Sequence, residues 1–254
     1  MQPSVIAFLG PSLAKREAVS IFKADYRGPA AMGDLTRAAS ENPAAIVLID
    51  GIFESGPSVW HKEILWALSR GIAVIGASSM GALRAAELCD SGMVGYGKVF
   101  EDFRSGKLND DDEVAVIHAP AELDYAPLSD AMVDIRAAVQ LAVSRCVLDA
   151  SEARMILQSA KACHFKHRHL SEAVSAGLCT ASGEEKVRFV SGWLGRSQYS
   201  VKADDARRLL VNLNELVELG RTRARQAPPF VDTVYLHRLA PFGFSGGPQV
   251  TTSH

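Results

Sequence analysis

The chain has 254 residues, enough for one large domain or a domain with a substantial extension. Hydrophobic residues make up 48% and charged residues 22%, with a formal net charge of -2, so the chain lacks the basic excess of a nucleic-acid-binding protein. No apolar run reaches membrane-spanning length, the first ten residues lack an export signal, and the four cysteines lie far apart. We therefore expect a cytoplasmic protein with reduced thiols, no membrane segment and no nucleic-acid partner.

Short apolar runs rich in β-branched residues predict four buried strands in the first half of the chain, at residues 4–9, 44–49, 72–75 and 113–118. Between the second and third runs, Pro57 suits a first helical turn and Gly71 suits a helix end. The apolar face of that helix would consist of Trp60, Ile64, Leu65 and Leu68. A strand–helix–strand unit of this kind predicts parallel strands.

The second half of the chain has a different pattern, because Ala, Leu, Arg and Glu recur there at helical spacing. The expected fold is therefore α/β, with a mostly parallel sheet layer in the N-terminal half and a helical C-terminal portion. We expect an α/β core over residues 1–125, a helical portion packed on or beside it over 126–220, and an extended, partly mobile tail over 221–254.

Chemistry is expected where three loops, residues 10–12, 50–56 and 77–81, leave the carboxyl ends of the predicted strands. The third loop, "ASSMG", resembles the nucleophile elbow G-x-S-x-G, with Ala77 in the first glycine position, Ser79 at the centre and Gly81 behind it. This register favours Ser79 over Ser78 as the nucleophile. Backbone N–H groups of the helix that starts near Met80 would stabilise an oxyanion. A plain N-cap serine is the alternative.

A hydroxyl nucleophile needs a base, and "WHKE" offers Lys62 near the start of the preceding helix. Adjacent strands lie about 4.8 Å apart, so a lysine at one strand end can reach a serine at the next. Partial desolvation near a helix N-terminus would favour its neutral amine. A solvated surface lysine is the alternative. His61 is more typical of a hydrogen-bonded structural histidine, and a Ser–acid–His order would instead draw on His118.

Three other features have two interpretations each. The acidic word "NDDDE" at 109–113 could hold a cation or contact a basic partner, but a solvated loop entering a strand is favoured. The word "CHFKHRH" at 163–169 has a Cys–His spacing that suggests metal, but it lacks a complete ligand set, so a basic exposed segment is favoured and no metal is expected. Cys89 could suggest persulfide transfer, but it would lie roughly 15 Å along the helix axis from the turn, so it is interpreted as a packing residue.

Taken together, the words "FLGPSL", "DGIF", "WHKEIL.AL..GI.V.GA.SMGALRAAEL" and "DDDEVAVIHAP" closely resemble the TfuA-like family over about residues 5–120. The resemblance implies a partner of YcaO proteins in peptide backbone thioamidation, a modification of ribosomal (RiPP-type) peptides. It implies hydrolysis of a thiocarboxylated ThiS-like sulfur carrier at a Ser–Lys site, releasing sulfide for YcaO, which engages the precursor peptide. By motif, the serine is Ser79 and the lysine is Lys62. No cofactor is implied, since ATP would belong to YcaO.

In the implied reaction, Lys62 takes the Ser79 proton, and Ser79 attacks the thiocarboxyl carbon of the carrier. The oxyanion would lie on the turn formed by Ser78, Ser79, Met80 and Gly81, with help from Ser12. Arg84 is a candidate for binding the anionic thiocarboxylate, and an i,i+3 pair with Glu87 is its alternative. Additional candidates for the pocket are Asp50, which could orient Lys62 or cap a helix, His61 and His118.

Two other functions compete with this hydrolase. One is a non-catalytic adaptor that brings the peptide and the sulfur carrier to YcaO, with the serine turn as a helix cap. The other is a serine hydrolase of small molecules, which would react with generic esters and show no preference for a carrier protein.

Overall fold

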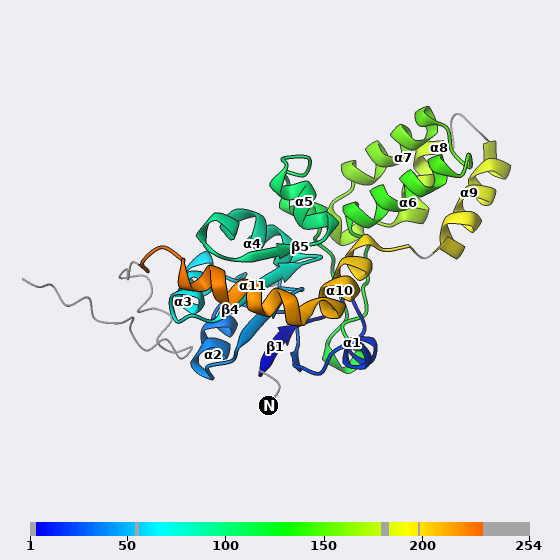
Figure 1. Cartoon of the computed structure of the whole chain (residues 1–254). Coiled ribbons are helices and arrows are strands. Elements are labelled where there is room, and N and C mark those ends of the chain that lie inside the picture. The colour runs from blue at the N-terminus through cyan, green and yellow to red at the C-terminus, as the bar shows by residue number, and fades with distance from the viewer. Residues whose placement is uncertain (1–3, 54–55, 179–182, 198, 231–254) are drawn as a thin grey trace, which may run out of the picture.

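The structure is a computed structural model and describes residues 4–53, 56–178, 183–197 and 199–230. Its centre is a five-stranded, fully parallel sheet in the order β2-β1-β3-β4-β5 (Figure 1). The strands are β1 (Val5–Phe8), β2 (Asp25–Arg27), β3 (Ala45–Leu48), β4 (Ala73–Ala77) and β5 (Val94–Tyr96). This is the strand order of flavodoxin-like doubly wound sheets, and it confirms the predicted parallel α/β layer.

Helices cover both faces of the sheet because alternate strand residues point to opposite sides. One face packs against α2 (Asp34–Ser40), α3 (His61–Ser69), α4 (Met80–Leu88) and α5 (Lys98–Arg104). The other face packs against α1 (Lys15–Ile21), α10 (Val201–Val211) and α11 (Leu213–Arg225). The last two helices thus return to the sheet after the intervening helical region, as Figure 1 shows.

The predicted strand at 113–118 is wrong. Residues Asp111–Glu113 form a short 3-10 helix, η2, and the following segment makes only one isolated antiparallel bridge, between His118 and Pro127. Glu113 is buried against cations from the helical region, which hold this stretch away from the sheet.

The predicted start of α3 is also corrected. Pro57 lies before the helix, which begins at His61. The buried Glu63 carboxylate accepts the N–H groups of Trp60 (3.1 Å) and Gly33 (2.8 Å), which sets the first turn and ties it to α2. Trp60 is therefore exposed, and Trp66 fills the core.

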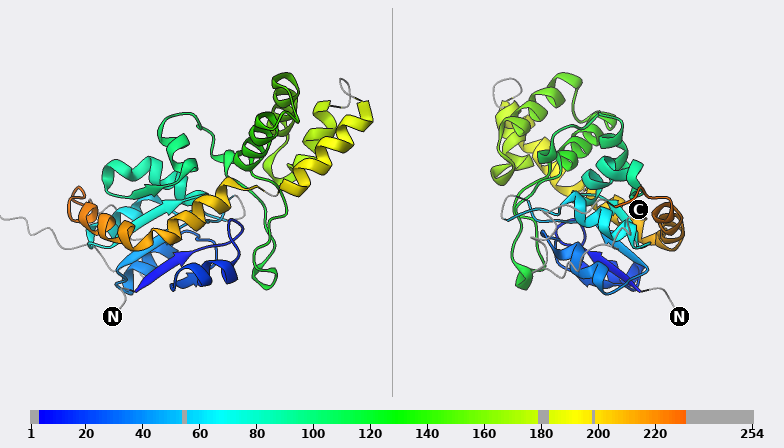
Figure 2. Two further views of the ribbon diagram at one scale, coloured as in Figure 1. Left: turned by 45° about the vertical axis from the view of Figure 1, so that its right-hand side comes forward. Right: turned by 90° about the vertical axis from the view of Figure 1, so that its left-hand side faces the viewer.

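Four helices form a second body beside the sheet layer, here called the helical lobe (Figure 2). They are α6 (Met132–Ser144), α7 (Ala150–Ala162), α8 (Leu170–Leu178) and α9 (Gly183–Ser197), and they share a hydrophobic core of their own. The helix α11 continues to Arg225, past the expected boundary at Gly220, and residues 231–254 of the expected tail lie outside the described residues.

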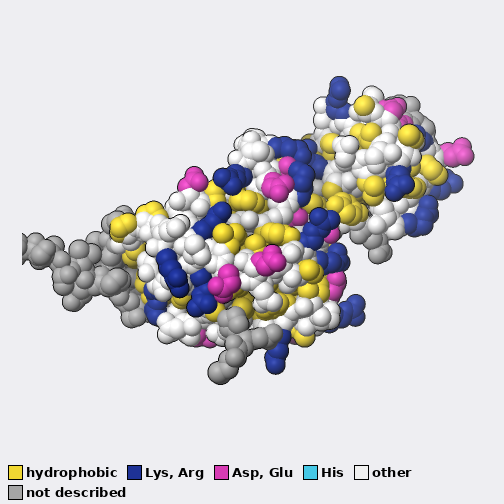
Figure 3. Space-filling view, in the orientation of Figure 1, with side chains coloured by type: hydrophobic (Ala, Val, Ile, Leu, Met, Phe, Trp, Pro, Cys, Tyr) yellow, Lys and Arg dark blue, Asp and Glu magenta, His cyan; other side chains and the backbone are white. Residues whose placement is uncertain are grey.

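The surface carries both signs of charge. On the face in Figure 3, basic and acidic side chains are interspersed over the sheet layer and the helical lobe, in keeping with the small net charge. Cys89, Cys146 and Cys163 are free thiols, Cys179 lies outside the described residues, and Cys89 packs against the core as predicted. Among the described helices, none has the length and apolarity needed to cross a bilayer.

Candidate functional site

The turn between β4 and α4 carries unusual backbone geometry at Ser78. Its φ is +69°, and the Ser79 N–H donates to the Ala77 carbonyl at 2.8 Å, so Ser78 is the centre of a γ-turn. Such a conformation costs a non-glycine residue about 1–3 kcal/mol and persists only where surrounding contacts hold it. Here the fully buried Ser78 hydroxyl donates to the Lys202 carbonyl at 2.9 Å.

Two glycines let the first turn of α4 lie directly against the sheet. A Cβ atom at Gly81 would overlap the carbonyl oxygen of Leu48, and one at Gly76 would overlap the carbonyl oxygen of Gly81. The Gly81 N–H donates to the Ile49 carbonyl at 3.2 Å. This contact explains the small residues of the motif, and it occupies one N–H that was expected to face an oxyanion.

Ser79 occupies the N-cap position of α4, yet its side chain makes no capping hydrogen bond. Its hydroxyl instead donates to the carbonyl of Val114 at 3.4 Å, on the segment that crosses the carboxyl edge of the sheet. Ser79 is 7% exposed, whereas Ser78 is 0% exposed. Of the two serines, Ser79 is therefore the one with a loosely held hydroxyl that faces a cleft.

A buried lysine, Lys202, reaches the same carbonyl from the first turn of α10. Its Nζ donates to the Val114 carbonyl at 2.9 Å, and the residue is only 2% exposed. Because Ser79 Oγ and Lys202 Nζ share one acceptor, these two atoms lie at most about 6 Å apart. The structure thus places the predicted serine and a lysine that sequence analysis missed on the same carbonyl acceptor.

The first turn of α10 is itself anchored to the helical lobe. Asp134 of α6 accepts the Ser200 hydroxyl at 3.0 Å and the Lys202 N–H at 3.2 Å, and the Ser200 hydroxyl in turn accepts the Ala203 N–H. Burial raises the pKa of the Asp134 carboxyl, against the opposing effect of the Lys202 cation and of these hydrogen bonds. The backbone that carries Lys202 is therefore fixed by α6.

The predicted convergence of loops at the carboxyl edge is present. Asp50, at the end of β3, is 1% exposed and accepts the N–H of Gly10 at 2.9 Å. It also accepts the N–H of Ser12 at 3.1 Å and the Ser12 hydroxyl at 2.7 Å. Asp50 thus holds the loop after β1, and in this arrangement the Ser12 hydroxyl is directed at a carboxylate.

These loops enclose a narrow cleft of about 10 Å³, lined by Pro11, Asp50, Gly51, Phe53, Ser79, Met80, Val114, Ala115, Val116 and His118. The His118 Nδ1 lies 2.8 Å from the Ala119 carbonyl, and its ring packs edge-on against Tyr125. A larger cavity of about 400 Å³ lies between the sheet edge and the helical lobe. It shares the Pro11 and Val116 walls with the cleft, and its lining includes Ser12 and Lys202.

Residues 50–169 match the family model described as TfuA-like protein. Over this region the chain is similar to TfuA-like proteins. The match confirms the resemblance, although it begins after the word "FLGPSL" and continues past residue 120 into the helical lobe. It includes Ser79 and Lys62 but not Lys202. No curated protein matches the chain. A TfuA-like protein implies a YcaO partner in general terms.

Within the TfuA-like region, Lys62 lies one residue into α3, and its Nζ lies 6.0 Å from the Phe230 ring centroid. Its neighbour His61 contacts Glu87, in the last turn of α4, at 2.8 Å. Among the described residues, no hydrogen bond joins Lys62 to Ser79. The role of Lys62 as the base stays a prediction.

Arg84 of the TfuA-like region makes both of its polar contacts away from the Ser79 hydroxyl. Its NH1 forms the i,i+3 ion pair with Glu87 at 2.7 Å, and its Nε donates to the Val59 carbonyl at 3.1 Å. The alternative interpretation of Arg84, as the partner of Glu87, is therefore the one that the structure contains.

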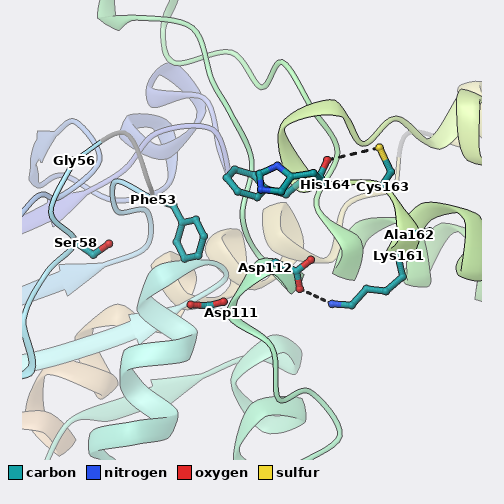
Figure 4. A pocket seen from close by; sticks show the side chains of 10 residues that line it. Phe53, Gly56, Ser58, Asp111, Asp112, Lys161, Ala162, Cys163 and His164 are labelled. Atoms are coloured by element: carbon teal, nitrogen blue, oxygen red, sulfur yellow. Dashed lines mark hydrogen bonds and ion pairs between the residues drawn. The ribbon is translucent and has the colours of Figure 1, made fainter.

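The acidic word of the TfuA-like region is solvated only in its first part, because residues 109–111 are exposed whereas Asp112 and Glu113 are not. Asp112 and Glu113 pair with Lys161 of α7, as Figure 4 shows for Asp112 beside a cavity of about 640 Å³. The basic word at 163–169 is also not a simple exposed segment, because Arg168 is 1% exposed and pairs with Asp112 at 2.7 Å. One carboxylate oxygen from each of Asp110, Asp112 and Glu113 lies within 4.8 Å of the others, but all three carboxylates form ion pairs with Lys161.

Proposed function

We propose that this TfuA-like protein is a Ser–Lys hydrolase that cleaves a thiocarboxylated ThiS-like carrier and releases sulfide for a YcaO partner in peptide backbone thioamidation. The observation that supports it best is the meeting of Ser79 Oγ and Lys202 Nζ at the Val114 carbonyl. The pair lies at the carboxyl edge of a parallel sheet, where ligands bind in open α/β folds.

In this proposal the Lys202 cation beside Asp134 first gives up a proton to solvent, and the resulting amine takes the proton from Ser79 as the serine oxygen attacks the thiocarboxyl carbon. The oxyanion of the tetrahedral intermediate would accept the Met80 N–H, because the first N–H of a helix has no intrahelical partner. The positive end of the α4 dipole acts in the same direction.

Collapse of the intermediate breaks the carbon–sulfur bond, and sulfide leaves with the proton held by Lys202. A water molecule then attacks the serine ester, with Lys202 again accepting a proton. The carrier is released with an ordinary carboxylate, and Ser79 regains its hydroxyl proton. One water is consumed for each sulfide released, and no redox step occurs.

Access to Ser79 would come from the 400 Å³ cavity, which is of ligand-binding size. This cavity and the cleft share two lining residues, Pro11 and Val116. The cleft itself has room for about one water molecule. The carrier end would therefore have to displace the Pro11 or Val116 wall as it enters.

The test is sulfide release from a thiocarboxylated ThiS-like carrier, with Ser79→Ala, Lys202→Met and Lys62→Ala compared with the wild type. We expect Ser79→Ala and Lys202→Met to lower kcat by about 10³-fold or more, as loss of a nucleophile or its base does. Lys62→Ala should remain within about threefold of the wild type, because Lys202 supplies the base in this proposal. Circular dichroism and thermal unfolding check the fold of each variant.

Other outcomes would point elsewhere. Full activity of Lys202→Met with loss in Lys62→Ala would return the role of base to Lys62. A wild type that releases no sulfide, or a Ser79→Ala variant that equals it, would contradict the hydrolase and favour the adaptor. Equal hydrolysis of generic esters and of the carrier would favour a hydrolase of small molecules.

A further inference from the structure

Two charged words of the sequence, 109–113 and 163–169, meet inside the molecule. The Arg168 guanidinium, 1% exposed, binds the Asp112 carboxylate through NH2 at 2.7 Å and the Asp112 carbonyl through NH1 at 3.1 Å. Its Nε also donates to the Ala160 carbonyl at the end of α7. One buried arginine thus holds both the side chain and the backbone of Asp112 against the helical lobe.

The next residue, Glu113, is held in the same way by another helix of the lobe. Its carboxylate is 3% exposed and accepts Arg136 Nε and NH2 at 2.9 Å each, in a two-point contact, and Lys161 Nζ at 3.0 Å. Burial would raise the pKa of Glu113, but the hydrogen bonds from Arg136 and Lys161 outweigh it and lower this pKa. The group therefore stays charged at neutral pH.

The residue after Glu113 is Val114, whose carbonyl receives both Ser79 Oγ and Lys202 Nζ. The peptide units on its N-terminal side are fixed by five charged side chains, here called the ion-pair network: Asp112, Glu113, Arg136, Lys161 and Arg168. A displacement of this network moves the acceptor that the serine and the lysine share.

We propose that the ion-pair network is a positioning device for the Ser79–Lys202 pair, acting through the Val114 carbonyl; this inference rests on the proposed function. The five residues are positioning residues, since they link the segment before Val114 to the helical lobe and, within the described part of the chain, none of them forms a hydrogen bond or ion pair with Ser79. Stability alone is a weak reason for such a network, because buried ion pairs often stabilise no more than apolar residues of the same volume. The placement of Glu113 and Asp112, one and two residues before the shared acceptor, supplies a reason.

The experiment compares Glu113→Gln with the matched control Asp111→Asn, using sulfide release to obtain kcat and KM separately. Asp111 lies in the same 3-10 helix but is exposed, so its variant removes a charge without disturbing the network. We expect Glu113→Gln to lower kcat by about 10- to 100-fold, the range expected for misplacement of a catalytic pair by about 1 Å, and KM to change by less than about twofold. Asp111→Asn should leave both constants unchanged.

A second variant covers the case in which Glu113→Gln folds poorly. Arg136→Lys keeps the positive charge but replaces the two-point contact with a single one, and we expect a smaller loss in kcat in the same direction. Arg136→Met should lower kcat as much as Glu113→Gln, and the double variant should be no slower than the slower single variant, because both act through one carbonyl.

The outcomes separate this inference from the function on which it rests. If Ser79→Ala is inactive but folded Glu113→Gln or Arg136→Met has wild-type kcat, the positioning role is overturned and the hydrolase stands. An equal loss of kcat in Asp111→Asn and Glu113→Gln also overturns the positioning role, because removal of any nearby acidic charge would then have the same effect. A wild type that releases no sulfide overturns both proposals.

Discussion

The two walls that meet at Ser79 are held in opposite ways. On the sheet side, the Ser78–Ser79 turn is held by backbone contact, with Gly76 and Gly81 leaving no space for a side chain. On the lobe side, the two residues before Val114 are held by charged side chains of the helical lobe that are far away in the sequence. Close backbone packing tolerates almost no substitution, whereas a charge network responds to pH and to partial replacement. The two walls should therefore fail differently when each is altered.

The largest effect is expected on the sheet side. Gly81→Ala places a Cβ atom on the Leu48 carbonyl oxygen, so α4 must move away from β3. We expect the free energy of unfolding to fall by about 3 kcal/mol or more, which is large for a single methyl group. Urea denaturation measures it. Gly192→Ala in α9 is the matched control, since its Cβ would meet only the end of Arg196, and it should stabilise the protein by about 0.5–1 kcal/mol.

A smaller effect tests whether the Ser78 turn is strained. Ser78→Ala loses the hydrogen bond to the Lys202 carbonyl and keeps the positive φ, so we expect a loss of about 1 kcal/mol. Ser78→Gly loses the same bond but relieves the strain, and it should be more stable than Ser78→Ala by about 1 kcal/mol. The order of the two unfolding free energies is the decisive measurement, and the reverse order would mean that the turn stores no strain.

The contrast between local backbone packing and ion pairs that are distant in the sequence also explains which elements the sequence could predict. The three predicted strands that exist, β1, β3 and β4, are uncharged and fully buried over four or five residues, whereas β2 and β5 have three residues each and are only partly buried. The turn at Ser79 was predictable because its small residues lie next to it in the chain. The false strand at 113–118 arose because the cations that capture Glu113 are 23 and 48 residues away.

Lys202 was missed for a similar reason, since 88 residues separate it from the carbonyl that it binds. A local signal for it exists nevertheless. The buried face of α10 consists of Val201, Lys202, Asp205, Ala206, Leu209 and Leu210. A lysine and an aspartate within an otherwise apolar stripe at helical spacing indicate charged groups that have buried partners.

The smallest predicted effect concerns two buried carboxylates, Glu113 and Asp205, which have different kinds of hydrogen-bond partner. Glu113 faces cations, and their hydrogen bonds hold its pKa below the ordinary value of 4.5. Asp205 instead accepts the N–H groups of Lys98 and Val99 at the start of α5, and burial raises its pKa from 3.8 to about 6 against these bonds. The two groups therefore contribute to stability with opposite dependence on pH.

The lowered pKa of Glu113 contributes stability that is present above pH 4.5 and is lost as the pH falls through the folded value. The raised pKa of Asp205 contributes stability that is present below pH 3.8 and is lost as the pH rises through about 6. Urea midpoints between pH 3 and 7 should therefore fall less on acidification in Glu113→Gln than in the wild type. In Asp205→Asn they should fall more steeply over the same range. Parallel curves for both variants would mean that neither carboxylate changes its pKa on folding, and that the lobe-side wall is held by shape in the same way as the sheet-side wall.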